Sequence, residues 1–170
     1  MSHGLLAEAL CGVGDVKNAA EAARRALELD ANSIQALGPV AYTISLIGDP
    51  NEALRHIERV LDLAPAHYVR AFFVSDAGLL QWKLGNPARA VALADEGARL
   101  KRESLLGPLV QAITMVGAGQ LDEAKAALAR ARILRPDLGP DMVRRILPFA
   151  DPADRTAVLD ALRRAGLDSV

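Results

Sequence analysis

The side chains that most often carry catalytic or metal chemistry are few in this chain and stand apart from one another. Its 170 residues contain three histidines, His3, His56 and His67, and a single cysteine, Cys11. No two histidines are four positions apart, the spacing at which one helical face supplies two zinc ligands. Cys11 lies in an apolar stretch with no histidine beside it, which favours a buried, unreactive thiol over a nucleophile.

Patterns for phosphate binding and acid–base catalysis are missing too. The glycines form neither a G-x-G-x-x-G nor a G-x-x-x-x-G-K phosphate loop. The acidic pairs Asp95-Glu96 and Asp122-Glu123 are typical of solvated helix faces rather than of catalytic carboxylates. We therefore predict that the chain is not an enzyme and that it holds no cofactor and no metal.

Composition restricts the class of protein further. Alanine (32 residues) and leucine (26) are abundant and aromatic residues make up 4%, which indicates an all-α protein. Twenty basic and 21 acidic side chains give a net charge of −1, so we expect no nucleic-acid partner. No apolar run approaches the roughly 20 residues that cross a bilayer. We expect a cytoplasmic protein without a membrane partner.

Four similar segments indicate which elements hold these residues. Gly14, Gly48, Gly85 and Gly119 are separated by 34, 37 and 34 residues, and alanine follows five positions after each, at Ala19, Ala53, Ala90 and Ala124. Each copy predicts a helical hairpin whose first helix ends at the glycine, in a left-handed conformation that costs least without a Cβ atom. Asp49-Pro50 and Asn86-Pro87 are typical of the start of the second helix. The alanines should lie where two helices cross.

In this spacing the sequence resembles a tetratricopeptide repeat array. The first-helix small residues of that family fall on Ala7, Ala41, Gly78 and Ala112, and its closing proline on Pro65 and Pro136. The closing position holds Ala31 and Arg102 in the other two copies, and Gln81 and Gln111 stand where the family prefers a large apolar residue. The resemblance implies a right-handed superhelical solenoid of antiparallel helix pairs, with repeats at 1–33, 34–67, 71–104 and 105–138.

The two ends of the array differ from the repeats. Three extra residues fall within 65–70 and predict a longer loop or an added helical turn. Residues 139–170 are expected to form capping helices, one over 140–147 and one from Pro152 to about Ala165 with apolar positions Val158, Leu159, Leu162 and Ala165 on one face. The C-terminal ending resembles those of bacterial adenylate cyclase and winged-helix regulators. Because the first helix opens almost at Met1, we expect the chain to be a fragment of a larger protein.

The resemblance also implies where a partner would bind, on the concave face of the first helices. Residues carried onto that face include Gln35 and Gly38, Leu106, Leu109, Ile113 and Val116, and the predicted partner-binding set is Tyr42, Leu46, Phe72, Leu79, Trp82 and Lys83. Only Lys83 is of the kind with which peptide-clamp members hold a carboxylate, so the face reads as apolar with an aromatic centre. Two alternatives stay open: the copy-four residues pack beneath the C-terminal helices, and Trp82 is buried within the solenoid.

Two functions fit this sequence. The first is a non-catalytic interaction scaffold that binds a peptide, a helix or a second copy of itself, which would make a homodimer. The alternative is a regulatory or sensory C-terminal fragment of a larger signalling protein, an adenylate cyclase or winged-helix regulator, whose active domain lies upstream.

Overall fold

The computed structural model describes residues 3–30, 34–63 and 69–167, apart from the side chains of Val16 and Gln35. Over these ranges the chain is entirely helical and contains no strand. The helices are α1 (His3–Gly12), α2 (Val16–Leu29), α3 (Ile34–Ile47), α4 (Pro50–Leu63), α5 (Arg70–Lys83), α6 (Pro87–Leu100), α7 (Leu106–Gly117), α8 (Leu121–Leu134), α9 (Pro140–Ile146) and α10 (Pro152–Arg164). The predicted helix stop at Pro65, the closing position Ala31 and residues 65–68 of the predicted longer loop lie outside the described residues.

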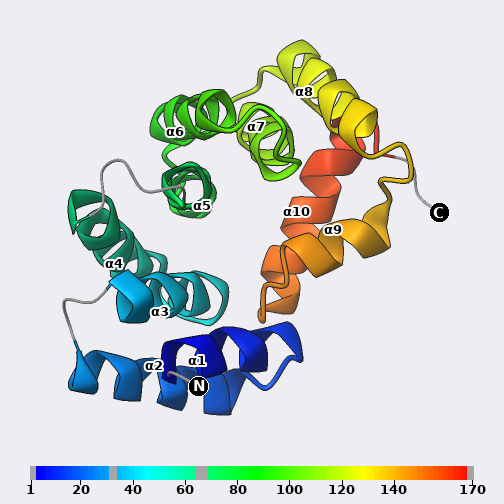
Figure 1. Cartoon of the computed structure of the whole chain (residues 1–170). Helices are drawn as coiled ribbons and strands as arrows, with labels where there is room; N and C mark the ends of the chain where they lie inside the picture. Colours follow the sequence, from blue (N-terminus) through cyan, green and yellow to red (C-terminus); the bar gives the residue numbers. More distant parts are fainter. Residues whose placement is uncertain (1–2, 31–33, 64–68, 168–170) are drawn as a thin grey trace.

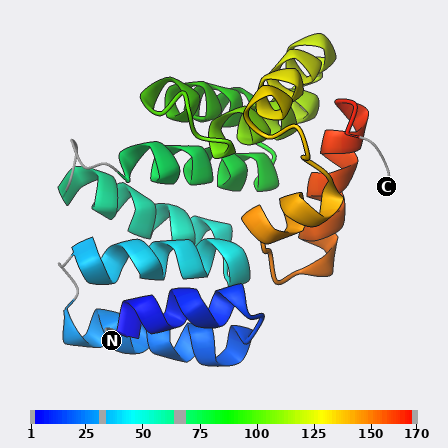
Figure 2. The ribbon, with the colours of Figure 1, turned by 45° about the vertical axis from the view of Figure 1, so that its right-hand side comes forward.

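The first eight helices form four antiparallel pairs that stack into a curved solenoid (Figure 1). Each pair packs on the next, so that α1, α3, α5 and α7 line the inner side of the arc and their partners lie outside. The predicted all-α solenoid of helix hairpins is thereby confirmed. The helices α9 and α10 depart from this stacking and lie on the inner side of the arc (Figure 2).

The four turn glycines end the first helix of each pair, as predicted, but they do so in two ways. Gly14, Gly85 and Gly119 have φ angles of +81°, +74° and +77°, the left-handed conformation that favours glycine. Gly48 does not have a positive φ, which corrects the expectation for that turn. A Cβ atom there would stand 2.9 Å from Ile44 Cγ2, so close contact with the preceding turn explains this glycine.

Helix starts follow the predicted capping chemistry at one of the two Asx-Pro sites. The carboxylate of Asp49 accepts a hydrogen bond from the Asn51 backbone N–H at 2.9 Å. Asn86 makes no such cap; its side-chain amide instead donates to Gln81 Oε1 at 2.8 Å. The Pro87 start therefore relies on the fixed φ of proline rather than on a side-chain cap.

The small residues of the second helices lie at helix crossings. Ala53 and Ala90 are fully buried. The crossing of α5 and α6 is close enough that a Cβ on Gly78 would stand 3.2 Å from Ala90 O. Helices therefore approach here at a separation that larger side chains do not permit.

We expect Ala53→Leu to lower the free energy of unfolding by roughly 1–3 kcal/mol, because three added carbons would overpack the contact between α3 and α4. Urea denaturation measures this change directly. The exposed Ala88, one position after the start of α6, gives the matched control, since Ala88→Leu should change stability by less than about 0.5 kcal/mol. Equal effects of the two substitutions would contradict the assigned register.

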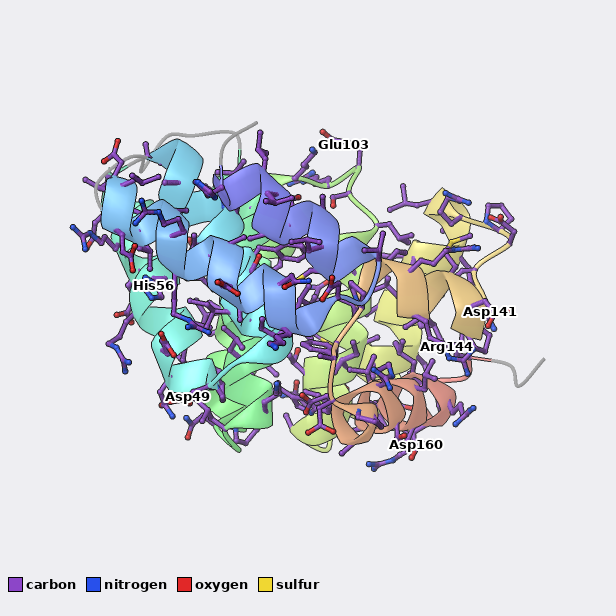
Figure 3. All side chains as sticks on the ribbon, turned by 90° about the horizontal axis from the view of Figure 1, so that it is seen from below. Asp49, His56, Glu103, Asp141, Arg144 and Asp160 are labelled. Carbon is purple, nitrogen blue, oxygen red and sulfur yellow. The ribbon has the colours of Figure 1, made fainter. Side chains whose placement is uncertain are left out.

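The C-terminal hairpin of α9 and α10 is packed into the same hydrophobic core as the repeats. The apolar positions predicted to share one face of α10, Val158, Leu159, Leu162 and Ala165, are all buried, and α10 lies against α7. After α10 the chain is held by a hydrogen bond from Arg132 Nη2 to Gly166 O at 2.9 Å. Polar residues such as Asp141, Arg144 and Asp160 extend from the outer side of this hairpin (Figure 3). The hairpin thus covers apolar surface of α7 and presents charged groups to water.

Candidate functional site

A groove of about 850 Å³ opens on the inner side of the solenoid. Its walls come from α1, α3 and α5, from the connection between α6 and α7, and from α9. The larger side chains that line it include Leu5, Glu8, Ile34, Tyr42, Phe72, Lys101, Leu106 and Ile146. This volume lies within the range of pockets that hold ligands of a few hundred daltons or a few peptide residues.

Aromatic rings form the centre of the groove. The rings of Tyr42 and Phe72 meet edge to face with centroids 5.3 Å apart, and Phe72 meets Phe73 in the same way at 5.2 Å. Tyr42 and Phe72 are half-buried, whereas Phe73 is buried. Edge-to-face contacts of this kind fix ring orientation, so the groove has a preformed aromatic wall.

The C-terminal segment closes one end of the groove. The backbone N–H of Ala150 donates to Leu46 O at 3.0 Å, which joins this segment to the last turn of α3. Lys83 Nζ lies 2.6 Å from Asp154 Oδ2 and 5.1 Å from the centroid of the Phe149 ring. These contacts place residues 149–154 over the C-terminal ends of α3 and α5.

The structure separates the six predicted partner-binding residues into three groups. Tyr42 and Phe72 line the groove. Leu46 and Leu79 are buried in the core cluster that includes the C-terminal hairpin, with 4% and 1% exposed, so they do not form open surface. Lys83 is engaged by Asp154.

Trp82 lies outside the groove. It is half-buried and packs on Gly117, where a Cβ atom would stand 2.6 Å from Trp82 Cδ1. The Trp82 side chain therefore lies between α5 and α7. Its exposure is intermediate, so it matches neither the exposed nor the fully buried alternative. The prediction that all six residues share one open surface does not hold, because the returning C-terminal segment covers half of it.

Most of the fourth-repeat residues assigned to the concave face pack beneath the C-terminal helices, which was one of the two alternatives. Leu109 and Ile113 are fully buried, and Val116 is 4% exposed, in the cluster with residues of α9 and α10. Leu106 also packs against that cluster but reaches the groove wall. Of this set, only Leu106 remains available to a partner.

Asp76 is a buried carboxyl group that the repeat register did not indicate. Its side chain is 5% exposed, and Oδ2 has no hydrogen-bond partner within the described part of the chain. Burial raises the pKa of Asp76 to about 7, against the lowering effects of Ser45 and Lys83. The available signal was a lone acidic residue within the apolar run Ala71–Leu80.

The Tyr42 hydroxyl lies near two acidic side chains, Asp76 and Glu8. Burial, together with the nearby charges of Asp76 and Glu8, raises the pKa of Tyr42 to about 12. The Tyr42 hydroxyl is therefore neutral at physiological pH and can donate or accept a hydrogen bond. Glu8 makes no ion pair with any described residue, and Lys101 stands on the wall near the start of α7.

The histidine and cysteine side chains form no reactive arrangement in the described ranges. Cys11 is buried in α1, and this burial raises the pKa of its thiol. His56 Nε2 lies 3.9 Å from Glu52 Oε1, while partial burial lowers the pKa of His56. No group of three or more potential metal ligands occurs among the described residues. His67 lies outside them.

None of the described helices is both long and apolar enough to cross a lipid bilayer.

Comparisons with known proteins place the fold. No protein-family model matches the sequence, and no curated protein matches it. A solved structure of MamA (AMB-1) is similar with a TM-score of 0.64 and 16% identity, covering 97% of this chain and 96% of MamA. YrrB, a tetratricopeptide repeat protein, is similar with a TM-score of 0.57 and 20% identity, covering 96% of this chain and 82% of YrrB.

A third similar structure is an O-GlcNAc transferase from Thermobaculum terrenum. Its TM-score is 0.59 and its identity 28%, covering 79% of this chain but only 26% of the transferase. The likeness therefore concerns a helical part of that enzyme. Together with the ten helices described above, these similarities show that the chain has the fold of a tetratricopeptide repeat solenoid.

Proposed function

We propose that this chain is a non-catalytic interaction module that binds an apolar segment of another protein in the groove beside Tyr42 and Phe72. The observation that carries the proposal is the half-buried aromatic pair on the wall of an 850 Å³ groove whose other lining residues are mainly apolar. Aromatic residues with part of their surface open are frequent anchors of binding energy in protein interfaces. YrrB, which has a similar fold, is described as having an unusual peptide-binding site.

Residues 149–154 at one end of the groove restrict the length and conformation of a peptide that could bind there. An extended peptide running through the solenoid would have to pass residues 149–154, which are held by the Ala150–Leu46 hydrogen bond and the Lys83–Asp154 ion pair. A chain end or a tight turn that inserts one or two apolar side chains fits the same space. We therefore expect short ligands with one large apolar anchor.

Selection from a displayed library of random 12-residue peptides on the immobilised protein tests this function. Enriched peptides should contain an aromatic or large aliphatic residue and should bind Leu5→Ser and Phe72→Ala at least about tenfold more weakly. Leu5 is 53% exposed, so its replacement should change binding with little effect on folding.

Val13 provides the matched control because it is 79% exposed and lies outside the groove. Val13→Ser should bind the selected peptides as the parent chain does. The proposal is wrong if no peptide is enriched, or if the selected peptides bind both groove variants with unchanged affinity.

The alternative function, a regulatory part of a larger signalling protein, rests on the likeness of residues 149–167 to the endings of bacterial regulators. Sequencing the native gene upstream of Met1 tests it. An adenylate cyclase or winged-helix domain in the same reading frame would support this function, and a stop codon directly upstream would contradict it.

A further inference from the structure

A second cleft, of about 570 Å³, is lined by residues of α6, α7 and α8 and of the connection after α6, and we call it the outer cleft. The three helices neighbour one another in Figure 1. The outer cleft is separate from the groove on the inner side and shares no lining residue with it. The lining residues are Ala98, Arg99, Arg102, Pro108, Gln111, Arg130, Ile133 and Leu134. The cleft thus combines three arginines with apolar side chains and contains no acidic residue in its lining.

The apolar part of the cleft is unusually open to solvent. Ile133 is 80% exposed and Leu134 is 37% exposed, side by side at the end of α8. Single exposed apolar residues are common, but two adjacent ones beside a concave surface indicate a contact site. Gly107 allows α7 to approach α6 here, since a Cβ atom would stand 2.9 Å from Ala98 Cα.

Gln111 forms hydrogen bonds that hold the polar side chains of the outer cleft in place. It occupies a repeat position at which the resembling family prefers a large apolar residue, and it is 9% exposed. Its Oε1 accepts a hydrogen bond from Arg130 Nη2 at 2.9 Å, and its Nε2 donates to Asp95 Oδ1 at 2.6 Å. The buried glutamine therefore fixes the guanidinium of Arg130 at the cleft without neutralising it.

The other two arginines are available to a ligand. Arg99 and Arg102 are exposed and make no ion pair within the described ranges. The acids nearest to them in the sequence are Asp95, engaged by Gln111, and Glu96, paired with Arg70 at 3.0 Å. Glu103 is also adjacent and projects from the edge of the molecule (Figure 3). Guanidinium groups form two parallel hydrogen bonds with a carboxylate, so three of them around an apolar patch match a ligand with both features.

From this arrangement we infer that the outer cleft is a second binding site, which takes an acidic segment of another protein with a leucine-sized side chain placed on Ile133 and Leu134. A protein segment fits better than a nucleic acid. The cleft offers apolar side chains where nucleic-acid sites place aromatic rings for stacking, and the chain as a whole has a net charge of −1.

Fluorescence anisotropy with a labelled 12-residue peptide, in which leucines alternate with Glu-Asp pairs, tests this site. The parent chain should bind it, and a copy with Gln and Asn in place of the acids should bind at least about tenfold more weakly. The double variant Arg99→Glu, Arg102→Glu should also lose at least about tenfold in affinity. The double variant Arg99→Gln, Arg102→Gln should also bind the acidic peptide more weakly than the parent. Because it removes the charges without reversing them, it controls for misfolding caused by the glutamate substitutions.

The double variant Arg24→Glu, Arg89→Glu has the same net charge and changes two exposed arginines outside the cleft. It should bind the acidic peptide within about twofold of the parent, as should the groove variant Phe72→Ala. Equal weakening by both charge-reversed variants, or no binding by the parent, would overturn the proposal. Tighter binding of a single-stranded oligonucleotide at the same arginines, or self-association that the Arg99/Arg102 variant abolishes, would identify a different occupant and would overturn it too.

Discussion

Asp76→Asn is expected to raise the free energy of unfolding at pH 8 by roughly 1–3 kcal/mol. The Asp76 carboxyl is buried, and burial raises its pKa from 3.8 to about 7. Between these two values the folded protein keeps a proton that the unfolded chain releases, so stability falls as pH rises through this window. Above pH 7 both states are ionised and the loss is complete. Asparagine has a similar shape and carries no charge, so it removes this penalty.

Urea denaturation at pH 4.5 and at pH 8 measures the effect. The parent chain and Asp76→Asn should differ little at pH 4.5, and the variant should be the more stable protein at pH 8. Asp62, exposed in α4, provides a control, since Asp62→Asn should change stability by less than about 0.5 kcal/mol at either pH. A variant that is less stable than the parent at pH 8 would mean that the Asp76 carboxylate is stabilised by its surroundings.

Phe149→Ala is expected to lower the free energy of unfolding by about 3–5 kcal/mol, the range for buried aromatic residues. Phe149 is only 2% exposed, and its ring lies beneath the Lys83 ammonium group. The substitution removes apolar contacts in the cluster that includes Leu46 and Leu79 and leaves a cavity there. The midpoint of urea denaturation, at an unchanged slope, reports the loss.

Val13→Ala gives the reference for this measurement, because Val13 is largely exposed, and it should cost less than about 0.5 kcal/mol. A cost below 1 kcal/mol for Phe149→Ala would contradict the packing of residues 149–154 over the ends of α3 and α5. The groove would then be open at both ends and could hold an extended peptide.

The helix pairs were predictable because their signals are local. A glycine after the first helix and an alanine five residues later recur in every copy, and both roles depend on residues within one hairpin. The exception, Gly48, shows the limit of such signals. The same residue type at the same position is explained by a steric contact with Ile44 rather than by a left-handed φ.

The groove could be predicted only in part because its extent depends on contacts between distant residues. The repeat register alone assigns Tyr42 and Phe72 to the inner face, and both line the groove. It also placed Leu46 and Lys83 there, but their surroundings depend on where the last 20 residues fold. Nothing in the local pattern of Pro148–Asp154 indicates that Asp154 meets a lysine 71 positions earlier.

Mapping of amide chemical-shift changes by NMR, with the parent chain titrated by a peptide selected on the groove, tests the central claim most directly. The proposed site predicts that the largest shifts fall on residues 38–42, 71–75 and 104–107, which line the groove on three sides. Residues of the outer cleft should stay near their free positions. Largest shifts within α10, or on the outer faces of α6 and α8, would contradict binding beside Tyr42 and Phe72.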